Sequence, residues 1–503
     1  MTLEEILAIE DTDKKIYLLK QYRRTKRPDV ASLKRDWDPK LHAVMDEKLR
    51  PKRRVLVKDE YVDDDGVTHK AEYKEEDVNR IAVPIEQDIV NIHTAFTVGK
   101  DPNLDCTPNN DAEKNLFSVV QSVNSENKIR YHNKRIVRSW FSETEMAEYW
   151  YTVDAGNFWN RVKAKFRQIF TGKVTPTKKL KCDIWSPFRG DSLYPFFDDS
   201  GDFKAMSREY SLKEYQLSDL SVKEVRYFQT VTDTDVFVWK YDNGNWQFVP
   251  EKSFRHGFTK TPCIYGYRPE PLCEKIRPLR ERYEKTLSNY ADCIDYHFFP
   301  YLILEGDLAG ENGLAGQDER RRVIKIENEG KAYYLTWDQT PEAIRLELDN
   351  LTDKIYAFTH TFQMSSKNIM EAASKAVSGR ALTFTFIGSH MEVENHAEVL
   401  GEFLQRRYNF LVSAIGSICP SLKNAADTID IEVKIVPFTI DDISERLDIA
   451  DKAKSSGFMS TRSGIMFVGL TDQVDEELKQ IEKERAESTP DPQSANRKSQ
   501  GES

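Results

Sequence analysis

Three long helical patterns in the second half of this 503-residue chain constrain its fold more than any other feature. Apolar residues recur at spacings of three and four, the spacing of one helix face, over residues 272–297, 341–361 and 381–418. The second pattern follows Thr340, a candidate N-cap, and opens with Pro341 at the first helical position. The sequence therefore predicts three long helices, the last of them the longest.

The two segments that separate these helices differ in kind. Residues 298–340 contain short strand patterns around a Gly-rich loop, which predicts a small β module at the tip of a helix pair. Residues 362–378 are mostly small and polar, with two lysines. A helix pair tipped by a small β module leaves exposed faces in a monomer, so we expect identical copies to pack side by side around an axis. Within the first helix, Pro278 should produce a kink or reset the helix start.

The first half of the chain mixes helices and strands. Helical patterns occur in residues 1–50, in residues 85–98 up to Gly99, and in residues 112–147. Alternating patterns predict hairpins over residues 53–73 and 235–249, the second with a turn at Asn243-Gly244. With the edge strand expected at 429–437 and short helices at about 441–455 and 471–487, the fold class is α+β.

Composition limits the classes of function. The chain is 39% hydrophobic and 31% charged, as in ordinary globular proteins, and its length predicts two to four subdomains. A net charge of −10 argues against wrapping DNA or an anionic membrane, although it permits DNA to pass through an assembly. No apolar run approaches the roughly 20 residues that span a bilayer, so we expect no membrane contact. Six scattered cysteines predict reduced thiols rather than a disulfide framework.

The chain contains no enzyme motif that rises above chance. The Gly-Lys pairs at Gly99, Gly172 and Gly330 lack the earlier glycine and the following Ser or Thr of a phosphate-binding loop. Tyr61 stands where a calcium-binding loop needs a carboxylate. His390 and His396 are six residues apart, on different faces of a helix. We therefore expect no enzymatic activity, no cofactor and no metal.

Five short motifs occur in an order that is similar to a known family. They are the aromatic-x-x-Gly-x-x-Pro run at 96–102, Glu148-Tyr149-Trp150 before a strand, the Pro-containing strand at 261–267, Ser378-Gly379-Arg380-Ala381-Leu382 at the restart of the longest helix, and the Ser-x-x and acidic helical patterns at 459–482. In this order the chain resembles the portal proteins of tailed bacteriophages, of the type found in phages with long non-contractile tails. The resemblance covers roughly residues 50–487, although a basic, aromatic insert around 157–181 has no place in it.

The resemblance implies a division of the chain into named parts. These are an N-terminal helical segment (1–50), a wing (51–271), two stem helices (272–297 and 341–361) that flank a clip (298–340), a tunnel loop (362–378), a long wing helix (379–419), a wing strand (420–440), a helical crown (441–487) and a disordered tail (488–503).

It also implies a function and a set of partners. Portal proteins form a ring, typically of twelve subunits, at one capsid vertex of the virion, and they are assembled in the bacterial cytoplasm. The ring admits and releases double-stranded DNA, binds the terminase and the head-to-tail adaptor, and contacts the major capsid and scaffolding proteins. Two other readings remain open at this point: a nuclease-like packaging factor with a divergent carboxylate site, and a tail or baseplate scaffold that also oligomerises.

The candidate site residues follow from these parts. In the tunnel loop they are Lys367, Asn368, Ser374, Lys375 and Ser378. Lysines contact phosphate as point charges, without the bidentate grip of arginine, and a ring repeats each of them once per subunit. The alternative is a solvated loop without a partner.

Charged residues supply the other two candidate sets. In the stem they are Arg277, Arg280, Glu281, Arg282 and Lys285, facing the tunnel or a neighbouring subunit. In the clip, Arg320, Arg321 and Arg322 are expected to meet terminase or adaptor, or to form a solvated charged turn.

Overall fold

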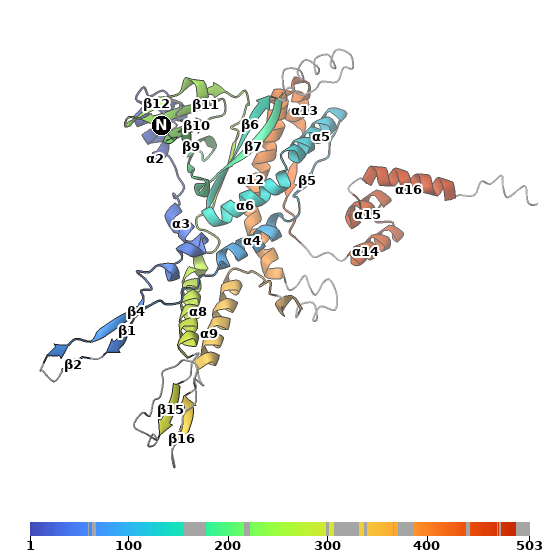
Figure 1. Cartoon of the computed structure of the whole chain (residues 1–503). Helices are drawn as coiled ribbons and strands as arrows, with labels where there is room; N and C mark the ends of the chain where they lie inside the picture. The colour runs from blue at the N-terminus through green and yellow to red at the C-terminus, as the bar shows by residue number, and fades with distance from the viewer. Residues whose placement is uncertain are drawn as a thin grey trace, which may run out of the picture. The chain divides into compact units, whose positions relative to one another are not determined.

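The chain folds into an α+β structure, known here from a computed structural model, with two compact units (Figure 1). One unit contains residues 1–362 and 388–438, and the other contains residues 363–387 and 439–503. The structure describes residues 1–58, 60–62, 67–154, 178–215, 222–297, 301–305, 331–335, 340–365, 367–370, 386–438, 443–469, 471 and 474–488. The predicted α+β class is confirmed.

An antiparallel sheet of six strands forms one part of the first unit. Its order is β12-β11-β10-β9-β8, with β13 added beside β11. The strands are β8 (Ser192–Phe197), β9 (Phe203–Tyr215), β10 (Val222–Val231), β11 (Asp235–Asp242), β12 (Asn245–Phe248) and β13 (Phe254–Arg255). The predicted turn between β11 and β12 is confirmed, because Asn243 and Gly244 have φ of 50° and 93°.

Helices at the N-terminus cover one face of this sheet. They are α1 (Leu3–Leu7) and α2 (Thr12–Gln21). The next helix, α3 (Val30–Trp37), packs against other helices of the first unit. Thr2 and Glu5 form a capping box that starts α1. Apolar residues of α1 and α2 pack against the sheet in one cluster: Leu3, Ile6, Ile16, Leu19, Tyr194, Phe196, Phe228 and Trp239.

A second sheet, of order β14-β6-β7, packs with four helices around the main core. Its strands are β6 (Glu145–Asp154), β7 (Lys178–Trp185) and β14 (Cys263–Tyr267), and the helices are α4 (Ile85–Val98), α5 (Asp111–Glu126), α6 (Ile129–Glu143) and α12 (Ile387–Ile418). Asp154 at the end of β6 pairs with Lys178 at the start of β7. Residues 155–177, which hold most of the basic insert, therefore connect two paired strand ends.

The helix predicted over 112–147 is in fact two helices followed by a strand. Lys128 has φ of 52° and separates α5 from α6, and Thr144 has φ of 67° and ends α6 before β6 begins. Left-handed backbone at these two residues breaks an otherwise continuous apolar pattern. By contrast, α4 matches its predicted bounds and stops at Gly99, where a Cβ would lie only 2.1 Å from the Ala95 carbonyl oxygen.

The two helices predicted to form a stem, α8 (Arg277–His297) and α9 (Thr340–Phe358), pack side by side (Figure 1). Pro278 lies in the first turn of α8, where a missing N–H is tolerated, so the predicted reset of the helix start is confirmed. Between them in sequence, β15 (Tyr301–Glu305) and β16 (Lys331–Leu335) pair antiparallel as predicted. The rest of the Gly-rich module lies outside the described residues.

A hairpin precedes α4 and stands apart from both cores. Strand β1 (Arg53–Lys58) pairs with β4 (Glu72–Glu76), and β2 (Tyr61–Val62) pairs with β3 (Thr68–His69), which confirms the predicted hairpin. All five residues of β4 are exposed. The side chains of β4 therefore lie outside both hydrophobic cores.

The end of the first unit and the second unit follow α12. In the first unit, α13 (Lys423–Thr428) is followed by β17 (Glu432–Lys434), which pairs with β5 (Asn103–Asp105). The second unit contains α14 (Ile443–Ser455), α15 (Thr461–Val468) and α16 (Val474–Ser488). The sequence reading missed α15, although Ser460 caps its start and Gly469, with φ of 73°, ends it.

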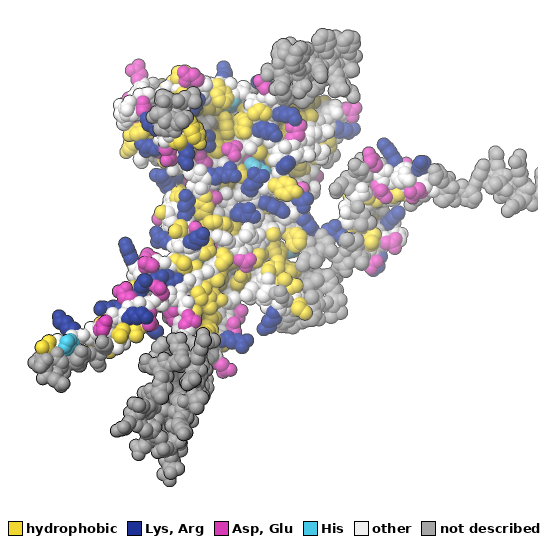
Figure 2. Space-filling view, in the orientation of Figure 1, with side chains coloured by type: hydrophobic (Ala, Val, Ile, Leu, Met, Phe, Trp, Pro, Cys, Tyr) yellow, Lys and Arg dark blue, Asp and Glu magenta, His cyan; other side chains and the backbone are white. Residues whose placement is uncertain are grey.

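Two further expectations concern thiols and membranes. All six cysteines are free, and Cys263 and Cys273 are buried while the other four are partly buried. Among the described helices, none has the length and apolar character needed to cross a bilayer. On the face shown in Figure 2, positive and negative side chains are interspersed rather than gathered into a basic surface.

Candidate functional site

The chain leaves the first unit after Phe362 and returns at Gly388. Side chains hold these two points together. The Ser389 hydroxyl donates to the His360 carbonyl oxygen at 2.9 Å, and His360 Nδ1 lies 2.7 Å from Glu392 Oε1. We call this contact between the end of α9 and the start of α12 the joint. The segment Gln363–Ile387 thus starts and ends at the same place on the first unit.

Two buried histidines lie behind the joint. His93, on α4, makes hydrogen bonds through Nε2 with the Thr361 hydroxyl at 2.8 Å and the Thr359 carbonyl oxygen at 2.9 Å. Its ring is 5.6 Å from that of His396 on α12. Burial lowers the pKa of His93 to about 4 and that of His396 to about 2. Both histidines are therefore neutral at pH 7, and the joint is an uncharged contact on that side.

The predicted tunnel-loop residues lie only partly in the described chain. Lys367 is exposed. The Asn368 side chain donates to Gln363 Oε1 at 3.0 Å, and its backbone N–H donates to the Ser365 hydroxyl at 3.1 Å. Asn368 therefore stabilises its own turn. Ser374, Lys375 and Ser378 lie outside the described residues, as do the clip residues Arg320, Arg321 and Arg322.

Arg280 has a different place from the one expected. Its side chain is 1% exposed and lies at the start of the stem, 3.1 Å from Asp36 of α3 and 3.0 Å from Glu86 of α4. This position leaves it no surface toward a tunnel or a neighbouring subunit. Burial raises the pKa of Glu86 to about 7, although Arg280 acts in the opposite direction. Sequence spacing alone could not reveal these partners, because they come from distant segments.

The other stem charges are arranged around it. Arg277 pairs with Asp36 at 2.6 Å and with Glu274 at 2.5 Å, while Arg282 pairs with Glu347 of α9 at 2.6 Å. Glu281 lies 3.8 Å from Arg280, and Lys285 is exposed. Among the five predicted stem residues, Glu281, Arg282 and Lys285 therefore remain accessible to a partner.

The segment just before α4 is hydrogen-bonded to the opposite face of α8. The backbone N–H groups of Val83 and Ile81 donate to Glu284 and Ser288, each at 2.9 Å, and that of Asn79 donates to Asp292 at 2.7 Å. Acceptors spaced four residues apart on one helix face meet donors spaced two apart on an extended chain. The sequence does contain a signal for this contact, namely hydrogen-bond acceptors at every fourth position of α8. The contact was not predicted from it.

A fully buried ion pair fixes the long helix α12 to the second sheet. Arg407 donates to both carboxylate oxygens of Glu148, at 2.6 to 3.1 Å, and to Asn133 Oδ1 at 2.6 Å. His132 and the Trp150 indole N–H also contact Glu148. Burial alone would raise the pKa of Glu148, but the charge of Arg407 and the bond to His132 lower it well below the ordinary value. In the sequence, Glu148 stands out only as part of a short motif.

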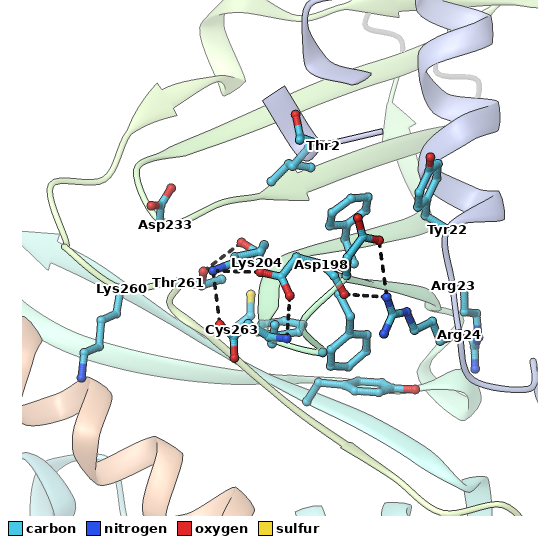
Figure 3. Close-up of a pocket in the computed structure, with 18 of the residues that line it drawn as sticks. Thr2, Tyr22, Arg23, Arg24, Asp198, Lys204, Asp233, Lys260, Thr261 and Cys263 are labelled. Atoms are coloured by element: carbon cyan, nitrogen blue, oxygen red, sulfur yellow. Dashed lines mark hydrogen bonds and ion pairs between the residues drawn. The ribbon is translucent and has the colours of Figure 1, made fainter. Parts of the chain in front are cut away.

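A cleft of about 870 Å³ lies between the N-terminal helices, the β8–β9 turn and α12 (Figure 3). Its charges neutralise one another locally. Arg24 lies 3.9 Å from the Asp199 carboxylate, and Lys204 pairs with Asp198 at 3.2 Å and Asp202 at 3.6 Å. No group of three or more His, Cys, Asp or Glu side chains in the described residues is arranged to hold a metal ion. The lining has no nucleophile beside a base, so this cleft gives no support for catalysis.

Comparison with known proteins identifies the family. Residues 41–491 match the family described as "Phage portal protein, SPP1 Gp6-like". Among solved structures, the chain is similar to one from "Neck of empty GTA particle computed with C6 symmetry", with 12% identity, a TM-score of 0.38, and coverage of 77% of this chain and 90% of that chain. No curated protein matches the chain. Because the family match spans most of its length, the chain belongs to the SPP1 Gp6-like phage portal proteins, a family of structural proteins of the virion.

Proposed function

We propose that this portal protein forms a ring at one capsid vertex and provides the channel through which double-stranded DNA is packaged and ejected. The ring, expected to have twelve subunits, would also dock terminase on one side and the head-to-tail adaptor on the other. Membership of the portal family supports this proposal most strongly. The joint adds a structural reason, because it holds both ends of Gln363–Ile387 at one point of a firmly packed unit.

The parts of the chain take their roles from this assembly. We assign the stem to α8 and α9, the clip to residues 298–340, the tunnel loop to 362–378 and the crown to the three helices of the second unit. The wing contains both sheets and α12. In this assignment the tunnel loop begins four residues after α9 ends, so movements of the stem reach it directly.

Electrostatics support passage rather than retention of DNA. A chain with net charge −10 binds no duplex tightly over its whole surface, since affinity for DNA grows with the number of phosphates neutralised. Lys367 is exposed in the proposed loop, and Lys375 belongs to the same segment. A ring repeats each lysine, so a weak charge per subunit becomes a cationic collar around the channel.

Replacing Lys367 and Lys375 with Glu tests the collar. We expect rings to form as in the wild type, while the amount of DNA packaged per particle falls, because a negative collar repels phosphate. The control carries Glu at Lys423 and Lys452, two exposed helix positions outside the proposed loop. DNA per particle is measured by quantifying nuclease-protected DNA against capsid protein. Unchanged packaging in the loop variant would remove these lysines from the mechanism.

A further inference from the structure

The solvent-facing surface of α6 carries cations with no acidic side chain among them. Lys128 is the N-cap residue of this helix, and four more cations follow within ten residues: Arg130, Lys134, Arg135 and Arg138. All five are exposed except Lys134, which is partly buried. The helix itself has one acidic residue, Glu143, which is buried at its end. We call the five cations the basic arc.

Helical geometry places the basic arc on one side of α6. Because successive residues are about 100° apart, the five positions span about 160° of the helix circumference and about 15 Å of its length. Ile129, Ile136 and Trp140 lie on the opposite side and are buried in the main core. Tyr131, which is 60% exposed, lies within the arc. The whole solvent-facing side of α6 is therefore cationic, with one aromatic ring among the charges.

The described chain neutralises little of this charge. Arg130 lies 3.9 Å from Asp101, but the two side chains are 57% and 60% exposed, so this ion pair is weak. Arg138 donates to the neutral side-chain oxygen of Asn91 at 3.1 Å. The other three cations of the arc have no ion-pair partner among the residues that the structure describes.

The basic arc is unfavourable for the isolated helix. Arg130, Lys134 and Arg138 follow one another at intervals of four residues, a spacing at which like charges destabilise a helix. The positive end of the helix dipole adds to their potential, because the first turn of α6 has no acidic residue and no side chain caps it. An anion that lies against this surface would remove both costs.

The dimensions of the basic arc fit the backbone of duplex DNA. A duplex carries one phosphate per about 3.4 Å on each strand, so about 15 Å of contact presents about four phosphates of the nearer strand to the five cations. Arginine binds phosphate with two parallel hydrogen bonds, and three of the five cations are arginines. The hydroxyl of Tyr131 is a further donor of the kind that contacts phosphate oxygens.

A second copy of the chain fits the basic arc less well. The chain has 73 basic and 83 acidic residues, so cations interrupt the acidic side chains on its surface. Duplex DNA, by contrast, offers negative charge alone at a regular spacing. The net charge of −10 argues against binding over the whole surface of the protein, but it leaves room for one local site.

We infer that the basic arc of α6 binds the phosphate backbone of duplex DNA, without preference for base sequence. This site is separate from the proposed channel contact, because α6 belongs to the first unit and residues 363–378 of the tunnel loop belong to the second. The two contacts also differ in kind. The arginines of the arc suit a duplex that is held, whereas lysines suit a duplex that moves past them.

Salt-dependent binding of a labelled DNA duplex to the full chain tests the arc, with Kd measured by fluorescence anisotropy. The test variant carries Arg130→Gln, Lys134→Gln and Arg135→Gln, because glutamine removes the charge and keeps a high helix propensity. At about 50 mM salt we expect its Kd to be at least about tenfold above that of the wild type. The slope of log Kd against log salt concentration should fall by about 2.7, since each lost phosphate contact removes about 0.9.

Two matched variants control for net charge and for folding. The first removes three exposed cations elsewhere, with Lys423→Gln, Lys452→Gln and Lys454→Gln. The second keeps the charge of the arc, with Arg130→Lys, Lys134→Arg and Arg135→Lys. Both should bind the duplex within about threefold of the wild type, because the phosphate contacts remain. Circular dichroism confirms that each variant is folded.

Three results would overturn the basic arc as a DNA site: a wild type that does not bind the duplex at low salt, a glutamine variant of the arc that binds like the controls, or an unchanged salt slope. A glutamine variant that keeps its affinity but loses rings in native mass spectrometry would also overturn it, since the arc would then be a contact between copies. A wild type that binds the duplex through the arc but forms no ring would instead defeat the proposed channel alone.

Discussion

Two buried arginines show how differently α12 and α8 hold an internal charge. Arg407 on α12 and Arg280 on α8 are both almost completely inaccessible. Arg407 is matched by one carboxylate and donates hydrogen bonds from all three of its nitrogens. Arg280 faces the carboxylates of Asp36 and Glu86, and its Nε and Nη1 have no hydrogen-bond partner.

The Arg407 contact is a permanent ion pair, whereas the contact around Arg280 contains a group that titrates. A buried pair with complete hydrogen bonding keeps its charges at all ordinary pH values. At the start of α8, by contrast, both carboxylate oxygens of Glu86 are buried without a hydrogen-bond partner, and burial raises the pKa of Glu86 to about 7. His42 and Glu284, 2.6 Å apart, face the same cluster and act on the pKa of Glu86 in opposite directions, His42 lowering it and Glu284 raising it. The contact of α12 with the second sheet therefore keeps its charges, while the contact at the start of α8 responds to pH.

Removing the wing anchor should have the largest effect. Arg407→Met leaves Glu148 buried without its main partner, which typically costs about 3–5 kcal/mol. Urea unfolding followed by tryptophan fluorescence measures the loss, since Trp150 contacts Glu148. The double variant with Glu148→Gln should recover much of the stability, because no uncompensated charge remains. A loss below about 1 kcal/mol in the single variant would show that the pair is solvated.

The stem cluster should titrate near neutrality. The pKa of Glu86 is raised from 4.5 to about 7 in the folded state, so its stabilising contribution is complete below pH 4.5 and is lost as pH rises to 7. The corresponding change is about 3 kcal/mol. Glu86→Gln should therefore be more stable than the wild type at pH 8 and similar at pH 4.5. Thermal unfolding at these two pH values measures the difference, and an equal difference at both would contradict it.

The stability of the joint should change with pH in the opposite direction to that of the Glu86 contact. His93 and His396 have lowered pKa values, so their stabilising contributions are present above pH 6.5 and are lost as pH falls. At pH 5 these histidines are neutral in the folded chain but protonated in the unfolded chain. Folding therefore loses about 2 kcal/mol of stability for each of them. His396→Phe should reduce this acid sensitivity. Hydrogen exchange at the ends of α9 and α12, compared at pH 7 and pH 5, measures it. Equal protection at the two pH values in the wild type would contradict it.

The pair between the stem helices should matter least. Arg282 and Glu347 are only 2.6 Å apart, but their side chains are 55% and 37% exposed. Exposed pairs typically contribute about 0.2–1 kcal/mol, so Arg282→Gln should change stability by no more than that. Urea unfolding gives the value. A loss as large as that of Arg407→Met would mean that Arg282 is buried against a neighbouring subunit in the sample.

Local signals in the sequence predicted much of the fold. The bounds of α4, the turn at Asn243-Gly244 and the start of α8 near Pro278 follow from residues close together in the chain. The family resemblance also came from short motifs, and the match over residues 41–491 confirms it. Such features are readable because caps, turns and apolar spacing act within a few residues.

Long-range partners could not be predicted in the same way. Glu148 and Arg407 are 259 positions apart, and nothing in their local patterns connects them. In the sequence, Arg280 lies in a run of charged residues that is typical of an exposed surface. In the structure, α3 and α4 cover its side chain. The two hydrogen bonds of the joint depend on where α9 ends relative to α12, which a helical pattern leaves open. The site was thus harder to predict than the elements that carry it.

Cryo-electron microscopy of the assembled protein tests the central claim most directly. We predict a closed ring with an axial channel, in which residues 362–378 of every subunit lie at the channel wall. A ring in which this segment is packed away from the channel, inside its own subunit, would contradict the account.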